Sequence, residues 1–253
     1  MEQSINQTSN KENEKITQRI QIGTEKGMNF QVKEAYKTLR ANIEFSGVEN
    51  RIISITSCTP REGKSSVAMN LAVSIAQVGL KVVLIDADLR KSVLMKRYKT
   101  KSVKYGMTHF LSGQKTFNEV YYRTNIPNLS VVFSGPPAPN PSELISGDKF
   151  YSMLEQLNSH FDYVIIDTPP IGSVIDAALI SRYSHGTIMV LESNSISYKF
   201  AQRAKNQLEQ SGGKLLGCVL NKVDISSKNH YGKYYGKYYG KYYGKYYGEE
   251  YGE

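Results

Sequence analysis

Short, unbroken aliphatic segments alternate with helix-patterned segments along most of this chain of 253 residues. Strands are expected at residues 51–56, 81–86, 131–133, 163–167, 187–191 and 215–220. Helices are expected at residues 31–45, 64–78, 141–158 and 197–210. Strands that are buried on both faces read as continuous Val/Ile/Leu runs. The alternation therefore predicts an α/β fold, a doubly wound and mostly parallel sheet with helices on both faces.

Composition divides the chain into three parts. Residues 1–28 are rich in Gln, Asn, Glu, Lys and Thr, and we expect them to lack fixed structure. Residues 29–224 carry the strand and helix patterns and are expected to form the folded domain. From residue 230 the chain reads HYGKYYGKYYGKYYGKYYGEEYGE, with frequent glycine and no aliphatic residue. Residues 225–253 (the tail) are therefore predicted to be flexible.

Several classes of protein are disfavoured by what the chain lacks. Its longest apolar runs have the length of buried strands, well short of the roughly 20 residues of a membrane-spanning helix. Residues 1–19 contain no apolar core of a secretory signal. Cys58 and Cys218 form no spaced metal or disulfide pattern, which suits a reducing cytoplasm.

The formal net charge of +9 includes one concentrated basic stretch, residues 90–104. This stretch has two interpretations: an ordinary solvated surface, or a binding surface for an anionic partner such as an acidic protein, phosphorylated tyrosines or lipid headgroups. No recognised nucleic-acid module accompanies it, so nucleic acid is not expected as a partner. Its basic residues are Arg90, Lys91, Lys96, Arg97, Lys99, Lys101 and Lys104.

A phosphate-binding loop is predicted where RIISITSCTPREGKSS joins a strand to a helix. Backbone N–H groups and the helix N-terminus would surround the phosphates of ATP, and Gly63 permits a close approach. Lys64 would reach the β- and γ-phosphates, and the Ser65 hydroxyl would bind Mg²⁺. Cys58 replaces the usual first glycine and would have to adopt that glycine's conformation. The expected nucleotide-binding residues are Thr59, Pro60, Arg61, Glu62, Gly63, Lys64, Ser65 and Ser66.

Three aspartates follow two further buried strands. KVVLIDADLR delivers Asp86 and Asp88, and FDYVIIDTPP delivers Asp167. Since ligands bind at the carboxyl ends of strands in open α/β sheets, these carboxylates should meet beside the phosphate loop. With Ser65, Asp88 and Asp167 are expected to hold Mg²⁺ and its waters. Each aspartate alone could instead be a helix N-cap.

These motifs place the chain near the Min-type and partition ATPases, although Thr59 stands where those proteins carry a signature lysine. From about residue 34 to the end, the chain more closely resembles the bacterial tyrosine kinases of capsular and exopolysaccharide operons. The resemblance rests on TPREGKSS, VVLIDADLRKS, GPPAPNPSEL, DYVIIDTPP, GCVLNKVD and the terminal tyrosine cluster. Ser92 stands where the family has a proline, a change expected to affect a loop and not the chemistry.

The resemblance implies an ATP- and Mg²⁺-dependent protein-tyrosine kinase. Asp86 would accept the proton of the tyrosine hydroxyl, and Lys64, Asp88 and Asp167 would complete the catalytic group. By analogy with related ATPases, Asn221 would contact adenine, although a structural role after a strand is equally ordinary. The family's subunit-contact motif corresponds to Glu34, Lys37 and Arg40, so a ring-like homo-oligomer is expected.

The tail supplies the expected phosphate acceptors. Its 29 residues span roughly 100 Å at most when extended, enough to reach a neighbouring subunit, so transfer in trans is expected. Added phosphates would make the tail anionic and loosen the oligomer. An aromatic segment for stacking or self-association is the alternative. The acceptors are Tyr231, Tyr234, Tyr235, Tyr238, Tyr239, Tyr242, Tyr243, Tyr246, Tyr247 and Tyr251.

Family resemblance also implies the partners and location. A membrane adaptor of the polysaccharide co-polymerase type would recruit the cytoplasmic chain to the inner face of the membrane and activate it, and a cognate tyrosine phosphatase is a further expected partner. Regulation of capsule or exopolysaccharide synthesis and export would follow. Two alternatives stay open: a Min- or partition-type positioning ATPase without kinase activity, and a binding module gated by ATP.

Overall fold

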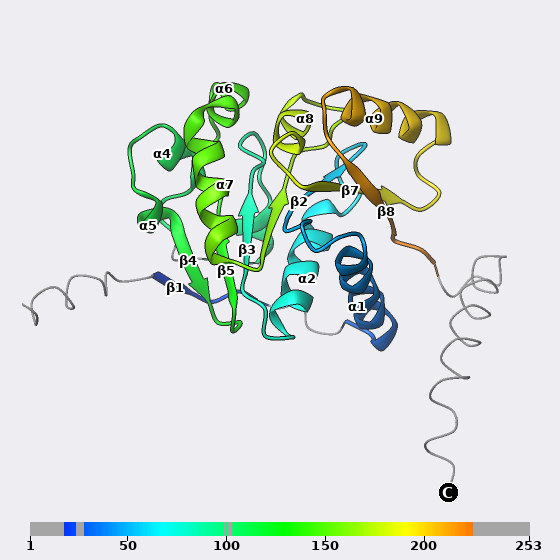
Figure 1. Ribbon diagram of the computed structural model, residues 1–253, viewed down its shortest axis with the longest axis horizontal. Helices are drawn as coiled ribbons and strands as arrows, with labels where there is room; N and C mark the ends of the chain where they lie inside the picture. The colour runs from blue at the N-terminus through cyan, green and yellow to red at the C-terminus, as the bar shows by residue number, and fades with distance from the viewer. Residues whose placement is uncertain (1–17, 24–27, 99, 101–102, 225–253) are drawn as a thin grey trace, which may run out of the picture.

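The computed structural model describes residues 18–23, 28–98, 100 and 103–224, and its described strands form one sheet in the order β1-β4-β5-β3-β6-β2-β7-β8 (Figure 1). The strands are β1 Gln18–Ile20, β2 Ile52–Ser57, β3 Val82–Asp86, β4 Tyr121–Thr124, β5 Leu129–Val132, β6 Tyr163–Asp167, β7 Gly186–Glu192 and β8 Leu215–Asn221. All neighbours run parallel except the antiparallel pair β4 and β5. The predicted doubly wound, mostly parallel sheet is confirmed.

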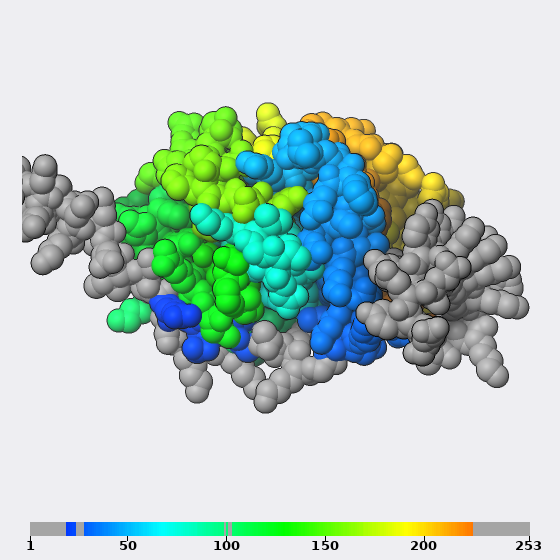
Figure 2. Space-filling view, turned by 60° about the horizontal axis from the view of Figure 1, so that its bottom comes forward, coloured from blue at the N-terminus to red at the C-terminus, as the bar shows by residue number. Residues whose placement is uncertain are grey.

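Helices cover both faces of this sheet. They are α1 Phe30–Phe45, α2 Lys64–Ala76, α3 Leu94–Arg97, α4 Met107–Leu111, α5 Phe117–Val120, α6 Pro141–Ser146, α7 Asp148–His160, α8 Asp176–Ser181 and α9 Tyr198–Gln210. Figure 2 shows α1 as a blue ridge beside the cyan α2, with the dark-blue β1 next to the green β4–β5 segment. No helix within the described residues is long and apolar enough to span a membrane.

The core is split by the sheet into two apolar layers. Ile52 and Ile53 are neighbours in β2 but belong to opposite layers, because successive strand side chains point to opposite faces. One layer packs under α1 and α2 through residues such as Leu71. The other packs under α7 through Phe150 and Leu154. Strands buried on both faces explain why the sequence shows unbroken aliphatic runs.

The amino-terminal segment differs from expectation. We predicted that residues 1–28 lack fixed structure, and this is wrong for Gln18–Ile20, which form β1 and pair in parallel with β4. Ile20 and Ile22 are buried, and the backbone N–H of Ile22 donates to Asn125 Oδ1 at 2.7 Å. The segment is polar on average, but Ile20 and Ile22 within it pack into the apolar core at the β1 edge of the sheet. Residues 1–17 and the predicted tail, 225–253, lie outside the described residues.

The expected helix over residues 141–158 is two helices, α6 and α7. They are separated at Gly147, whose φ of −77° and ψ of 153° are extended and not helical. The glycine after Ser146 is a turn signal that the single expected helix did not take into account. By contrast, the helix expected at 31–45 is confirmed as α1, where the side chain of Asn29 accepts the N–H of Val32 and caps the first turn.

Candidate functional site

The phosphate loop, residues 58–66, joins β2 to α2, as expected from the sequence. Cys58 does not take the glycine conformation that we expected of it. Among described non-glycine residues, the positive φ in this loop belongs to Arg61, at 72°, and Gly63 follows at 97°. Cys58 is instead buried with its Sγ 3.6 Å from Met189 Sδ, and burial raises the pKa of its thiol to about 12. The left-handed backbone conformation therefore lies at Arg61, three residues after Cys58. The Cys58 side chain packs in the core instead.

Lys64 opens α2 and lies against two of the predicted carboxylates. Its Nζ is 3.4 Å from Asp167 Oδ1 and 3.7 Å from Asp88 Oδ2, and it is also 3.3 Å from Ser65 Oγ. Burial opposes the ammonium charge, yet the attraction of Asp167, Asp88 and Asp86 is larger and raises the pKa of Lys64. The lysine is thus kept charged at the point where a phosphate chain would lie.

Sheet register brings the aspartates together. Asp86 at the end of β3 is the Cα partner of Asp167 at the end of β6, and Ile55 of β2 pairs with Asp167 on its other side. Asp86 is fully buried, and burial, with repulsion from Asp167, raises its pKa to about 7. Burial also raises the pKa of Asp167. A carboxyl whose pKa lies near neutrality suits proton transfer.

Ser92 contacts the carboxylate of Asp86 directly, contrary to our expectation that it affects only a loop. Its Oγ donates a short hydrogen bond to Asp86 Oδ2. Because the bond favours the ionised form, Ser92 partly offsets the rise in the pKa of Asp86. The family's proline could not provide this donor. The segment that follows β3 therefore tunes the proposed base, which the sequence pattern did not indicate.

The donor set at this end of the sheet fits a magnesium ion bound together with a nucleotide. Three carboxylates face one lysine, and the Ser65 hydroxyl lies beside them. In the part of the chain that the structure describes, no group of three or more His, Cys, Asp or Glu could hold a metal ion by itself. Mg²⁺ commonly keeps several waters and completes its shell with substrate phosphates, so few protein ligands suffice.

Glu62 holds the phosphate loop from inside, a role that the sequence did not indicate. Its buried carboxylate accepts the N–H of Thr59 at 2.8 Å and the N–H of Glu192 at 3.4 Å. The Asn221 amide, at the end of β8, donates to the Glu62 carbonyl at 2.8 Å, and Lys222 Nζ donates to the Arg61 carbonyl at 2.8 Å. The loop is therefore tied to β7 and β8. Asn221 has the structural contact that the sequence left as an alternative, and its expected contact with adenine stays a prediction.

A second polar network fixes the segment after Asp88. Arg90 forms a two-pronged contact with Asp176 on α8, with Nε–Oδ2 at 2.7 Å and Nη2–Oδ1 at 3.0 Å. Ser142 on α6 donates to Asp176 Oδ1 at 2.7 Å, and the Asp176 side chain is fully buried. Asp88 Oδ1 accepts the backbone N–H of Lys91 at 2.9 Å. The predicted basic stretch thus begins with a structural arginine.

Other parts of the basic stretch are also engaged. Arg97 Nη1 donates a short hydrogen bond to Ser66 Oγ, so this arginine contacts the phosphate loop. Lys99 and Lys101 lie outside the described residues, and the remaining lysines carry no contact that assigns them a partner. The expectation of an anion-binding seat at residues 90–104 stays a prediction.

On α1, the three expected subunit-contact residues do not share one role. Lys37 Nζ is 2.7 Å from Glu34 Oε1 at the surface. Arg40 turns toward its own α2, where Nη1 donates to the Ser74 carbonyl at 2.8 Å. Glu34 and Lys37 are thus the pair presented outward. The acceptor tyrosines of the tail lie outside the described residues.

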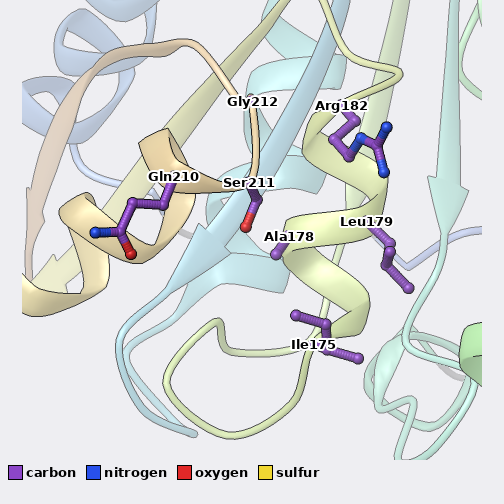
Figure 3. Close-up of a pocket in the computed structure, with 7 residues that line it drawn as sticks. All are labelled: Ile175, Ala178, Leu179, Arg182, Gln210, Ser211 and Gly212. Atoms are coloured by element: carbon purple, nitrogen blue, oxygen red, sulfur yellow. The ribbon is translucent and has the colours of Figure 1, made fainter.

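A separate hollow of about 520 Å³ lies between α8 and the end of α9 (Figure 3). None of its lining residues belongs to the phosphate loop or the aspartate group, and Arg182 supplies its one charged side chain. The hollow is lined by Ile175, Ala178, Leu179, Arg182, Gln210, Ser211 and Gly212. Since the loop chemistry lies elsewhere, this hollow is not the nucleotide site.

Comparison with known proteins agrees with this geometry. An AAA-domain family model matches residues 50–209. A tyrosine-protein kinase CpsD of Streptococcus agalactiae is 44% identical over 204 residues, which cover 80% of this chain and 89% of that protein. The tyrosine-protein kinase CpsD of Streptococcus pneumoniae serotype 4 is 45% identical over 200 residues, covering 79% and 88%.

Among solved structures, the chimerical protein CapA2B2 matches with a TM-score of 0.74 at 34% identity, covering 82% of this chain and 94% of that one. The kinase domain of the Escherichia coli tyrosine kinase ETK matches with a TM-score of 0.75 at 31% identity, covering 84% and 92%. The septum site-determining protein MinD of Pyrococcus horikoshii, solved with Mg-ADP, has a TM-score of 0.59 at 25% identity, covering 71% and 73%.

Proposed function

The chain belongs to the bacterial tyrosine kinase family, and on that premise we propose that it transfers the terminal phosphate of ATP to tyrosine side chains of its own tail. The observation that carries this proposal is the position of Lys64 Nζ, 3.4 Å from Asp167 and 3.7 Å from Asp88, at the carboxyl ends of adjacent strands. Relatives named tyrosine-protein kinases align over about four fifths of the chain. Regulation of capsule or exopolysaccharide synthesis is the cellular role that we propose with it.

The transfer step divides among few residues. Lys64 would neutralise the oxygens of the transferred phosphoryl group, which suits a reaction that depends mainly on alignment and charge. A tyrosine oxygen would attack the γ-phosphorus, the bond to ADP would break, and the phenolic proton would pass to Asp86. A phenol with a pKa of about 10 is protonated at neutral pH, so a nearby base with a pKa of about 7 is useful.

Magnesium, when bound, would supply Lewis-acid chemistry that neutralises charge on the phosphate. Ser65, Asp88 and Asp167 are the residues that we propose to hold it and its waters. The loop residues 59–66 would surround the phosphates with their backbone N–H groups, except at Pro60, and we propose that Asn221, which donates to the Glu62 carbonyl, contacts the adenine base. The Glu62 carboxylate would position Thr59 and not touch the nucleotide, because it accepts backbone N–H groups, which leaves the Glu62 backbone N–H for the phosphates.

We further propose that transfer occurs in trans within a ring-like homo-oligomer, with Glu34 and Lys37 of α1 at the subunit contact and Arg40 supporting the helix from behind. A membrane adaptor would recruit the chain to the inner face of the membrane, and a tyrosine phosphatase would reset the tail. Support for the adaptor comes from the match to the CapA2B2 chimera. Phosphate charge on the crowded tails would then loosen the ring.

Phosphotyrosine mass spectrometry after incubation of the chain with Mg-ATP and its adaptor tests the proposal. We expect phosphate on residues between Tyr231 and Tyr251, and none in a Lys64→Met variant. Mixing the Lys64→Met chain with an active chain whose tail tyrosines are Phe tests transfer in trans, and labelled Lys64→Met chain is the expected result. ATP hydrolysis without any phosphotyrosine would leave a positioning ATPase as the function and end the kinase proposal.

A further inference from the structure

A second binding feature lies at the opposite end of the sheet from the phosphate loop. A groove of about 1050 Å³ is bounded by β1, β4, the start of β5 and α7, elements that Figure 1 shows together on the green side of the molecule. Lys81 immediately precedes β3 and Phe161 precedes β6, and both line the groove. It therefore opens at the amino ends of the parallel strands, whereas Lys64 and the aspartates lie at their carboxyl ends.

The rim of this groove, called here the basic groove, is cationic. Arg19 on β1 and Arg123 on β4 are direct Cα partners in parallel strands, so their side chains leave the same face of the sheet. Like charges placed opposite one another destabilise a strand pair. Lys81 and Lys149 add two further cations, and Asp148 is the carboxylate that the lining contains.

Among the residues that the structure describes, no ion pair neutralises these four cations. Within the part of the chain that the structure describes, none of Arg19, Lys81, Arg123 and Lys149 has a side-chain ion pair, although nine ion pairs form elsewhere. Lys115, two residues before the groove residue Phe117, does pair with a carboxylate, that of Glu119. Repulsion between Arg19 and Arg123 would be relieved by an anion bound between them.

The wall of the groove is aromatic. Ring centroids of Phe117 and Tyr121 are 5.8 Å apart, and those of Tyr121 and Phe161 are 6.2 Å apart, which forms a row of half-buried rings along the groove. The Tyr121 hydroxyl is hydrogen-bonded to Ser130 Oγ at 2.7 Å, which holds the ring in place. An incoming aromatic ring could pack edge-to-face on this row at the usual 4.5–7 Å. The groove thus offers ring contacts and phosphate contacts together.

From this combination we propose that the basic groove binds the tail of this chain, residues 225–253, after its tyrosines are phosphorylated. A phosphotyrosine carries an aromatic ring and about −1.5 to −2 charges, which matches an aromatic wall with a cationic rim. The volume of the groove is at the upper end of ligand pockets, roughly 300–1000 Å³, so it can take more than one side chain. This inference rests on the proposed kinase function for the source of the phosphate.

Chain length permits this contact. The tail leaves the domain after β8, and β8 and β1 lie at opposite edges of the sheet, seven strand spacings or roughly 34 Å apart. Tyr231 lies seven residues past Asp224 and reaches about 25 Å at most. Tyr238 and the later tyrosines reach about 50 Å or more, so the distal repeats can occupy the groove of their own or a neighbouring chain. Docking there would hold the phosphorylated tail away from the phosphate loop.

A synthetic peptide tests the proposal without any kinase activity. The probe is KYYGKYYG, residues 233–240, with phosphate on Tyr234 and Tyr238, and its binding to full-length Lys64→Met chain is followed by fluorescence anisotropy. We expect binding that weakens with salt, and at least about tenfold weaker binding of the unphosphorylated peptide, because hydrogen bonds to charged groups contribute about that factor. Equal binding of the two peptides would overturn the proposal.

Matched charge variants locate the site. Arg19→Gln/Arg123→Gln, made in the Lys64→Met chain, should weaken phosphopeptide binding by at least about tenfold, and Lys149→Gln alone by a few-fold. The control, Lys199→Gln/Arg203→Gln, removes the same charge from exposed positions of α9 and should change binding by less than about twofold. Equal losses in the two double variants would overturn the proposal. Thermal unfolding no lower than in the parent confirms that Arg19→Gln/Arg123→Gln is folded.

Competitors separate the phosphotyrosine tail from other anions. Phenyl phosphate should displace the peptide at a lower concentration than inorganic phosphate, because the aromatic wall contributes to binding. Equal competition by inorganic phosphate, or Arg19- and Arg123-dependent binding of phosphatidylglycerol vesicles without peptide binding, would refute tail docking and indicate a plain anion site or a membrane contact. Phosphopeptide binding together with absent autophosphorylation would instead reject the kinase function and keep the groove.

Discussion

Replacing Asp176 by asparagine should weaken the attachment to α8 of the segment that follows β3 and carries Asp88 and Arg90. The Asp176 side chain is fully buried and accepts from Arg90 Nε at 2.7 Å, Arg90 Nη2 at 3.0 Å and Ser142 Oγ at 2.7 Å. Asparagine retains the shape and one acceptor oxygen but loses the negative charge. Arg90 would then lose the carboxylate that holds it to α8, and the segment next to Asp88 would become free to move.

The expected loss of stability can be bounded from these contacts. Removing one member of a fully buried ion pair costs about 3–5 kcal/mol. Arg90 is 38% exposed and can be rehydrated, so the smaller figure for hydrogen bonds to charged groups, about 1.5–3 kcal/mol, applies. We expect the free energy of unfolding of Asp176→Asn to fall by about 2 kcal/mol. Ser142→Ala, which removes one neutral donor, should cost about 1 kcal/mol.

Urea unfolding of Asp176→Asn, Arg90→Gln and the double variant measures the pair directly. Contacting charged residues should show a coupling free energy of about 1–2 kcal/mol. Activity is the second measurement: kcat/KM for autophosphorylation should fall about tenfold in Asp176→Asn and less in Ser142→Ala, because only the former frees Arg90. A coupling below about 0.5 kcal/mol, with unchanged kcat/KM, would refute the idea that Asp176 positions the Asp88 segment.

Three further outcomes are expected. In magnesium-free protein, the raised pKa of Asp86 means that the folded chain keeps a proton which the unfolded chain has lost between pH 3.8 and about 7. The free energy of unfolding, measured with urea, should therefore fall as pH rises through this range. An equally steep fall in the Asp86→Asn variant would contradict this. Ser92→Ala removes a hydrogen bond that favours ionised Asp86, so the acid limb of the kcat/KM–pH profile should move to higher pH, and an unmoved limb would exclude this contact. Asn221→Ala removes the 2.8 Å bond to the Glu62 carbonyl, so unfolding should become easier by about 1 kcal/mol and ATP should bind more weakly in calorimetry, whereas unchanged affinity would show that β8 does not hold the loop.

The site also shows how far local patterns extend. Asp86 and Asp167 were expected to meet because parallel strands end at one edge, and their register as direct partners confirms it. The role of Ser92 was misjudged, because a serine six residues after Asp86 gives no sign that the chain folds back to place its hydroxyl on that carboxylate. The groove beside β1 was missed for a related reason: Arg19 and Arg123 are unremarkable in sequence and become a like-charged pair only through strand pairing.

By itself, the sequence determined the parallel α/β sheet, the phosphate loop before α2 and the strand ends that present Asp86, Asp88 and Asp167. Each of these features depends on periodicity or motif spacing within a short segment, and such local patterns can be read from the sequence. Tertiary structure alone decided that Arg90 is held by Asp176, 86 residues away, and that Glu62 reaches the backbone of Glu192, 130 residues away. Such contacts depend on which elements become neighbours in the fold, and a polar residue's eventual partner leaves no periodic signal in the sequence.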